Sequence, residues 1–377
     1  MATAERPDDG PDDRLVAQPE DRPAKGRKDG AVAARRGAGQ PGGKQTAATR
    51  IPNAVALAER CFQRKVRGYA EPGGRGRRSF RLIFEDGQSL IATRRRSVKR
   101  ADLEVLVLRA LRQQGAPVPA VLAYLEGWLF QQDLSGPRLS QVLARAPQDR
   151  VRYCLAPALE SLVKIRQAAD RADLNRQVAV LGSRRRWLQR FIMTPAALPL
   201  QRLPAPPQLE VAEIAARLAV GPPRFIKWDA RPGNAIMVED GSVHWVDWEN
   251  CGCRNPLDDV AWMLADEFMP DEPTGEAYLL NHFLPRIEPE MRPSDALAYL
   301  QLYGVFHTAV RLRLILQLKG QGEWWDPALC LARDKVGVTL DQAQLLCLRG
   351  ARWAESHPLS APLARWYRQT AQALSAL

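Results

Sequence analysis

The chain has 377 residues, of which 46% are apolar and 25% charged, so it can bury a sizeable core as an ordinary globular protein does. Its formal net charge is +12, concentrated in residues 59–112, where 15 Lys and Arg face 6 Asp and Glu. No nucleic-acid recognition motif accompanies this charge, so we expect a binding site for an anionic small molecule and a solvated basic face, with no nucleic-acid partner.

Other classes of protein are disfavoured by what the sequence lacks. No apolar run approaches the ~20 residues of a membrane span. The N-terminus has no apolar signal-peptide core, and its acidic residues argue against a transit peptide. The six cysteines are scattered except Cys251 and Cys253, whose spacing does not suit zinc, so we interpret them as free thiols in a reducing compartment. We therefore expect a cytoplasmic protein without a transmembrane segment.

The first part of the chain changes character near residue 50. Residues 1–50 are rich in Pro, Gly, Ala and both charges, which predicts a disordered tail. Residues 51–67 can hold a short helix. A glycine-rich stretch with Gly73, Gly74 and Gly76 follows, and such a stretch lets backbone N–H groups approach phosphates.

A small β-rich region comes next. Strands are predicted over 79–84 and 89–93, on either side of an Asp-Gly turn, and then over 121–125 and 128–131. Alternation along the second strand places Ala92 and Arg94 on one face. A helix is expected to begin at Glu104.

From residue 139 onward the apolar period is mainly helical, and the domain boundary is expected near Asp133. The expected fold class is therefore α+β, with an N-terminal lobe over 51–132 and a C-terminal lobe over 133–377. The main helices are expected over 150–172, 184–193, 209–220, 274–283, 293–318, 328–336, 340–356 and 359–373.

The most informative stretch is residues 225–262. Two apolar runs, 235–238 and 243–246, flank a Glu-Asp-Gly-Ser turn, which predicts a β-hairpin. Asp229 and Asn234 precede the first strand and Asp247 follows the second. The hairpin therefore brings these three polar residues to one end of the ribbon.

This arrangement suits phosphoryl transfer. Asp229 can serve the acceptor hydroxyl, while Asn234 and Asp247 supply the oxygen ligands that Mg²⁺ prefers. Each residue alone also favours turns, so the alternative is a set of ordinary turn residues. The joint spacing makes that alternative the weaker one.

The stretch resembles the catalytic core of the aminoglycoside phosphotransferase and choline kinase-like family of small-molecule kinases. The residues that carry the resemblance are Lys227-Trp228-Asp229, Asn234, Asp247-Trp248-Glu249 and Asn255-Pro256-Leu257-Asp258-Asp259-Val260-Ala261. The resemblance covers roughly residues 68–265. It implies a bilobal protein kinase-like fold with a small β-rich lobe, ATP and Mg²⁺ as cofactors, and a hydroxyl of a small molecule as acceptor.

The resemblance also implies roles in the N-terminal lobe. Gly73, Gly74 and Gly76 fall where the family has its nucleotide-covering loop. Arg94 stands where a phosphate-binding Lys is usual, paired to Glu104 on the following helix, although both residues can equally form a plain surface ion pair. The run 129–136, with Gln132, resembles the hinge that binds the adenine edge, and Asp259 matches a residue that braces the catalytic loop.

Two departures leave alternatives open. The family usually has a His where Lys227 stands, and that His fixes the metal-binding segment without doing chemistry. Together with Arg94 instead of Lys, this favours a nucleotide-binding pseudokinase or scaffold as one alternative. A kinase acting on protein or on a cell-envelope glycolipid is another, although no Ala-Pro-Glu stretch follows Asp247 as in ordinary protein kinases.

The acceptor is poorly determined by sequence. Acidic residues after the core could meet a cationic acceptor, and two tryptophans could stack on a quaternary amine. The simpler interpretation is that the acids lie exposed at a helix end and that the aromatics pack between helices. The residues concerned are Asp266, Glu267, Asp271, Glu272, Trp324 and Trp325.

Overall fold

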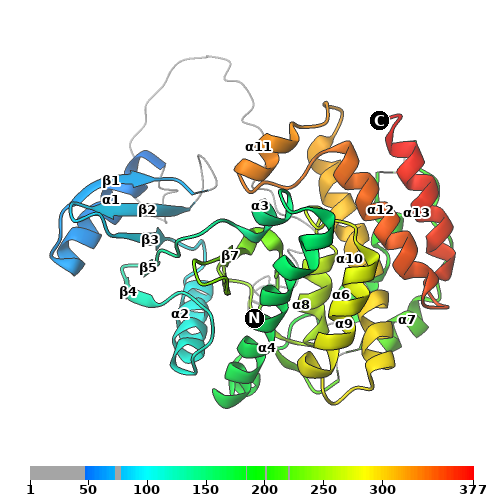
Figure 1. The fold of residues 1–377 in the computed structure, drawn as a ribbon, viewed down its shortest axis with the longest axis horizontal. Coiled ribbons are helices and arrows are strands. Elements are labelled where there is room, and N and C mark those ends of the chain that lie inside the picture. Colours follow the sequence, from blue (N-terminus) through cyan, green and yellow to red (C-terminus); the bar gives the residue numbers. More distant parts are fainter. Residues whose placement is uncertain (1–46, 73–77, 184, 200–201, 220) are drawn as a thin grey trace, which may run out of the picture.

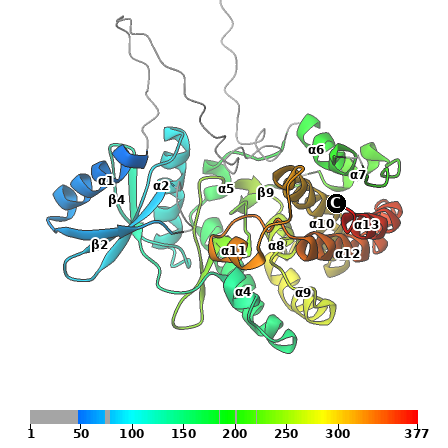
Figure 2. The same cartoon turned by 90° about the horizontal axis from the view of Figure 1, so that it is seen from above.

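The structure is a computed structural model that describes residues 47–72, 78–183, 185–199, 202–219 and 221–377 (Figure 1). The predicted tail falls outside these residues except for 47–50, which begin the first helix. The chain forms a small β-rich lobe followed by a larger, mainly helical lobe, and the two lie side by side (Figures 1 and 2). The predicted α+β bilobal fold is confirmed.

The small lobe is an antiparallel sheet with the strand order β1-β2-β3-β5-β4. Helix α1 (Ala47–Phe62) covers one face of the sheet, where its Leu57 packs into a cluster with Phe80, Leu90 and Ala92. Helix α2 (Val98–Gln113) packs its apolar side into the main core shared with the large lobe. The strands are β1 (Val66–Ala70), β2 (Ser79–Phe84), β3 (Ser89–Thr93), β4 (Val121–Leu125) and β5 (Trp128–Gln132).

The large lobe consists of helices around two short β-ribbons. One ribbon pairs β6 (Arg224–Ile226) with β9 (Gly252–Arg254), and the other pairs β7 (Ala235–Met237) with β8 (Val243–Trp245). The helices are α3 (Leu139–Leu143), α4 (Val151–Arg171), α5 (Leu174–Gln177), α6 (Arg185–Ile192), α7 (Val211–Arg217), α8 (Leu257–Leu264), α9 (Pro273–Ile287), α10 (Pro293–Lys319), α11 (Pro327–Ala332), α12 (Leu340–Glu355) and α13 (Ala361–Leu374).

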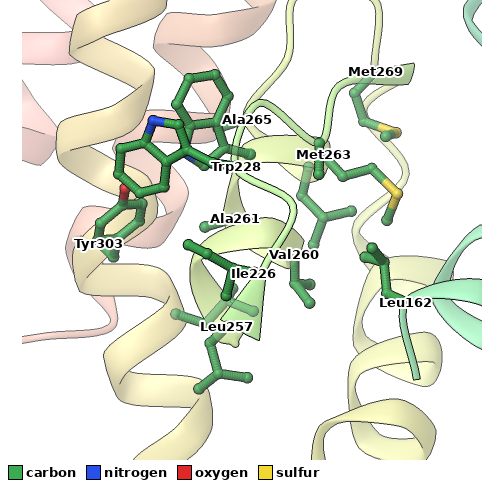
Figure 3. Close-up of a cluster of buried hydrophobic side chains, with 14 of the residues drawn as sticks. Leu162, Ile226, Trp228, Leu257, Val260, Ala261, Met263, Ala265, Met269 and Tyr303 are labelled. Carbon is green, nitrogen blue, oxygen red and sulfur yellow. The ribbon is translucent and has the colours of Figure 1, made fainter. Parts of the chain in front are cut away.

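The stretch with the predicted catalytic residues rests directly on the hydrophobic core. Trp228 lies among side chains of α8 and α10, beside Ile226 and Tyr303 (Figure 3). Its ring centroid is 5.4 Å from that of Trp262, at 51°. Such an aromatic pair contributes about 0.5–1.5 kcal/mol beyond the area it buries. The residue before Asp229 is therefore fixed by packing.

The connection between the lobes is anchored on both sides. Asp133 follows β5, and its carboxylate accepts hydrogen bonds from Arg81 (2.6 and 3.0 Å) and from Ser89 Oγ (2.6 Å). Three residues later, Gly136 has φ +150°, and a Cβ there would lie 2.0 Å from the carbonyl oxygen of Met237 in β7. Only a residue without a side chain can lie so close to that ribbon.

The predicted helices of the large lobe are confirmed, with ends that differ by a few residues. The predicted start of a helix at Glu104 is wrong, because α2 begins at Val98 and Glu104 is completely buried within it. Strands β1, β6 and β9 were not predicted, since each is only three to five residues long and lacks a clear apolar alternation. Within the described residues, no helix is long and apolar enough to cross a membrane.

Candidate active site

The β7–β8 hairpin brings the three predicted polar residues together. Its turn has Gly241 at φ +79°, and beyond the turn the N–H of Val246 donates to the carbonyl of Asn234 at 2.9 Å. Asn234 Nδ2 donates to the carboxylate of Asp229 at 3.0 Å and to its carbonyl at 3.1 Å. Asp229, Asn234 and Asp247 all line one cleft of about 580 Å³ between the lobes.

The backbone at these positions is unusual. Trp228, Asp229 and Asp247 have φ values of 55°, 62° and 64°. The left-handed region is disfavoured for residues with a Cβ, at a cost of about 1–3 kcal/mol each. The surrounding contacts must therefore hold both segments in place.

Lys227 provides such contacts. The side chain is fully buried, and Nζ donates to the carbonyls of Asp229 (3.2 Å) and Asp247 (3.1 Å). Nζ also lies 5.6 Å from the ring centroid of Trp248. Burial lowers the pKa of Lys227, while the neighbouring aspartates favour its charged form. One buried ammonium thus links the segment of Asp229 to the segment of Asp247.

Asp259, in the first turn of α8, holds the same segment from the other side. Its carboxylate accepts the backbone N–H groups of Lys227 at 2.7 Å and of Trp228 at 2.8 Å. Burial raises the pKa of Asp259 to about 7, against the pull of these two donors. These contacts agree with the bracing role that the resemblance implies.

Asp229 is placed for proton chemistry. Burial raises the pKa of its carboxyl above the usual range, and the guanidinium of Arg231 works in the opposite direction. Arg231 also lines the cleft, and Nη2 lies 3.3 Å from Oδ1 of Asp334. Arg231 was not singled out by sequence, although its place two residues after Asp229 was a signal.

The small-lobe side of the cleft corrects the predicted pairing of Arg94 with Glu104. Glu104 binds Arg95 rather than Arg94, with both carboxylate oxygens 2.6 Å from guanidinium nitrogens. Nη2 of Arg95 also lies 2.8 Å from Oδ1 of Asp247, and Nη1 lies 3.5 Å from Glu249. Glu104 also makes a contact across the lobes, because its carboxylate accepts a hydrogen bond from the backbone N–H of Trp248 at 3.2 Å.

The reason is the face of β3. Ile91, Thr93 and Arg95 line the cleft, whereas Ala92 is packed beneath α1 on the opposite face. Arg94 follows Ala92, and its guanidinium carbon lies 5.8 Å from the ring centroid of Trp128. Because side chains alternate, an error of one residue exchanges the two faces.

The predicted hinge is partly as expected. Gln132 lines the cleft, but its N–H donates to the carbonyl of Ala120 at 2.9 Å within the sheet. Its neighbour Gln131, which lies in the predicted hinge run but was not singled out, also lines the cleft and has a buried Nε2 without a hydrogen-bond partner. An orphaned amide at this place offers a donor to a ligand.

The predicted loop glycines Gly73, Gly74 and Gly76 lie outside the described residues. The residues on either side of that gap, Pro72 and Arg78, both line the cleft.

The donor set suits a hard cation that is bound together with a nucleotide. Asp247 offers a half-exposed carboxylate, and Asn234, whose Nδ2 is turned to Asp229, offers its amide oxygen. Across the described part of the chain, no three His, Cys, Asp or Glu form a group that could hold a metal alone. Phosphate oxygens and waters would complete the coordination of Mg²⁺.

The acids and tryptophans considered for a cationic acceptor lie elsewhere. Asp266 and Glu267 are buried rather than exposed, and Glu267 accepts two hydrogen bonds from Arg311 (2.8 and 2.6 Å). Asp271 lies 3.0 Å from Arg352, and Glu272 caps the N-terminus of α9. Trp324 and Trp325 pack against the main core, so their interpretation as packing residues is confirmed.

Comparisons with known proteins identify the family and similar folds. A family model described as "Phosphotransferase enzyme family" matches residues 71–304. No curated protein matches the sequence.

Solved structures with a similar fold include three phosphotransferases. Wild-type aminoglycoside 2'-phosphotransferase-IIIa in its GDP complex has a TM-score of 0.51 at 14% identity, covering 81% of this chain and 99% of that one. A choline/ethanolamine kinase family protein from Mesorhizobium loti has 0.50 at 18%, covering 85% and 99%. The macrolide 2'-phosphotransferase MphH from Brachybacterium faecium has 0.50 at 15%, covering 74% and 95%.

Proposed function

This chain belongs to the phosphotransferase enzyme family, and we propose that it transfers the γ-phosphate of ATP, bound with Mg²⁺, to a hydroxyl of a small molecule. The observation that carries the proposal is the meeting of Asp229, Asn234 and Asp247 on one inter-lobe cleft. A carboxylate beside a carboxamide, with a second carboxylate opposite, is the residue set that phosphoryl transfer uses.

The roles follow from the contacts. Asp229 accepts or orients the proton of the acceptor hydroxyl, and Asn234 holds the Asp229 carboxylate in position through Nδ2. Asn234 and Asp247 would hold Mg²⁺, which when bound neutralises charge on the transferred phosphate.

Arg95 is the small-lobe cation of the site. Glu104 orients its guanidinium through two short hydrogen bonds, and the same guanidinium reaches Asp247. A guanidinium has five N–H donors, so Arg95 keeps donors for nucleotide phosphates while it binds Glu104. Such catalysis depends mainly on positioning and on charge stabilisation.

The two departures from the family pattern have structural explanations. Lys227 links the two catalytic segments through their carbonyls, which is a fixing role without chemistry. The ion pair with Glu104 is formed by Arg95, one residue after the position considered first. Neither departure removes a group that the proposed chemistry needs.

The deciding experiment is a thermal-shift titration with ATP, with and without Mg²⁺. We expect Mg²⁺-dependent stabilisation in the wild type and its loss in Asp247→Ala. Asp149→Ala is the matched control, because that carboxylate is 80% exposed and lies outside the cleft. Equal stabilisation of Asp247→Ala and the wild type would contradict the metal assignment. If ATP stabilised neither protein, the proposed kinase activity would be contradicted and the alternative of a non-catalytic scaffold would be favoured.

A further inference from the structure

A segment near the end of the chain reaches the loop that carries Asp229 and Asn234. We call residues 229–234 the catalytic loop. Helix α11 lies beside α3 (Figure 1), and Asp334, two residues after α11, lines the cleft together with Asp229 and Asn234. The family model ends at residue 304, so Asp334 lies outside the match.

The carboxylate of Asp334 contacts the catalytic loop through two arginines. Its Oδ1 accepts a hydrogen bond from Nη2 of Arg231 at 3.3 Å, and its Oδ2 lies 3.3 Å from Nη1 of Arg138. The same nitrogen of Arg138 donates to the carbonyl of Gly233. The Asp334 side chain is 11% exposed, so this ion pair is screened less by solvent than a surface ion pair.

Gly233 leaves room for this carboxylate. A Cβ at Gly233 would lie 2.1 Å from Oδ1 of Asp334 and 2.9 Å from Nη2 of Arg231. Only a residue without a side chain lets both groups lie so close to the backbone. Asp334 therefore packs directly on the catalytic loop, one residue before Asn234.

Arg231 connects Asp334 to the proposed base. It is the second residue after Asp229, it lines the cleft, and its charge lies within electrostatic reach of the Asp229 carboxylate. Asp334 attracts Arg231 more strongly than Asp266 or Asp229 does. Removal of the Asp334 charge would therefore allow the guanidinium to move toward Asp229.

The segment that carries Asp334 is itself fixed to the large lobe. The N–H of Gly337 donates to Oε1 of Glu267 at 3.0 Å, and the N–H of Trp325 donates to the carbonyl of Val338 at 2.7 Å. Asp334 has a φ of 47°, a left-handed conformation that costs free energy for a residue with a Cβ. Such a backbone persists only where the surrounding contacts hold it, and it often marks a functional position.

We infer that Asp334 is a positioning residue of the active site, whose carboxylate fixes Arg231 and Gly233 and through them the catalytic loop. This inference rests on the proposed phosphoryl transfer, and it adds a part of the chain beyond the family match to the machinery of that reaction. The alternative is that the ion pairs of Asp334 only hold the segment after α11 on the large lobe.

The first test is hydrogen–deuterium exchange of the full-length Asp334→Asn variant, which keeps the size of the side chain and removes its charge. We expect the amides of residues 229–238 to exchange at least ~10-fold faster than in the wild type. A contact that only holds α11 would accelerate exchange in residues 327–338 and leave residues 229–238 unchanged. That result would overturn the inference, and it requires no known acceptor.

Asp271→Asn is the matched control. Its Oδ1 lies 3.0 Å from Nη2 of Arg352, it is 26% exposed, and neither residue lines the cleft. The variant loses a similar ion pair of the large lobe, so exchange in residues 229–238 should stay within about twofold of the wild type. Equal acceleration in both variants would show a general loosening of the lobe and would contradict a specific role of Asp334.

The second test separates turnover from nucleotide binding. With water as the acceptor, Asp334→Asn should lower kcat for ADP release from Mg²⁺-ATP about tenfold and change the Kd of Mg²⁺-ATP less than about threefold, because Asp247 and Arg95 lie outside the catalytic loop. The loss in kcat should not add to that of Arg231→Gln in the double variant, since both changes break the same contact. Additive losses would show that Asp334 does not act through Arg231.

The outcomes keep this inference apart from the proposed function. Unchanged exchange in residues 229–238 of Asp334→Asn, together with Mg²⁺-dependent ATP binding by the wild type, would overturn the role of Asp334 and leave the proposed function standing. Absence of Mg²⁺-dependent ATP binding by the wild type would contradict the proposed function itself.

Discussion

Replacing Lys227 by Met tests whether one buried ammonium holds the catalytic geometry. Met has a similar length but no donor, so the carbonyls of Asp229 and Asp247 each lose a charge-assisted hydrogen bond. Such bonds contribute about 1.5–3 kcal/mol each. Removing a buried charge also recovers several kcal/mol of desolvation, so the net loss in the free energy of unfolding should be only about 1–3 kcal/mol.

The effect on catalysis should be larger than the effect on stability. Asp229 and Asp247 both have left-handed backbones, and the Lys227 side chain links their carbonyls to each other. A displacement of about 1 Å at a reacting group can cost ~10²-fold in rate, so we expect kcat/KM to fall by about two orders of magnitude. Urea unfolding gives the stability change, and ADP release with a working acceptor gives the rate.

The chain contains a matched control for this substitution. Lys319 is also buried, and its Nζ also donates to two backbone oxygens, the carbonyl of Gly322 (2.9 Å) and the oxygen of the last residue, Leu377 (3.1 Å), none of which lines the cleft. Lys319→Met should lose comparable stability and keep kcat/KM within about twofold. Equal losses of activity in the two variants would refute a specific role of Lys227 in positioning.

Three further predictions follow from the site. Arg95→Gln should weaken Mg²⁺-ATP binding at least ~10-fold in a thermal-shift titration, whereas Arg94→Gln should change it less than about twofold. Because burial raises the pKa of Asp229, the acidic limb of kcat/KM should lie above the usual aspartate value, and Arg231→Gln should move that limb to still higher pH; an unmoved limb would exclude Asp229 as the titrating group. Asp259 has a folded-state pKa of about 7, so its contribution to stability is present below about pH 4 and is lost as pH rises through about 7. The free energy of unfolding of the wild type relative to Asp259→Asn, measured in urea, should therefore decrease from pH 4 to pH 8. A difference that does not change with pH would contradict the raised pKa.

The hairpin and the helices were predictable because their signals are local. An Asp-Gly turn between two apolar runs specifies the ribbon, and the ribbon specifies that Asn234 and Asp247 meet at one end. Long amphipathic helices such as α4 and α12 show their period over several turns, which explains why only their ends were uncertain.

The face of β3 could not be predicted in the same way. Leu90 and Ala92 are covered by α1, while Ile91 lies in the cleft, so both faces carry apolar residues and no alternation distinguishes them. Three consecutive arginines then follow, and their identical charge does not show which one turns toward Glu104. The answer depends on the position of α1, which is a tertiary contact.

The arginines that line the cleft beside Asp334 were missed for a related reason. Arg138, Arg231, Arg311 and Asp334 are separated by up to almost 200 positions in the chain, and each alone resembles a surface charge. Only the folded chain shows that carboxylates hold these arginines against the cleft.

The anchored connection between the lobes has a consequence for the rate of turnover. Asp133 is bound to the small sheet and Gly136 lies against β7, so the connection between these two fixed points consists of Leu134 and Ser135. The four φ and ψ torsions of these two residues are the backbone freedom of this connection. We therefore expect substitutions that stiffen Leu134 or Ser135 to change the residence time of ADP, if release requires the lobes to separate.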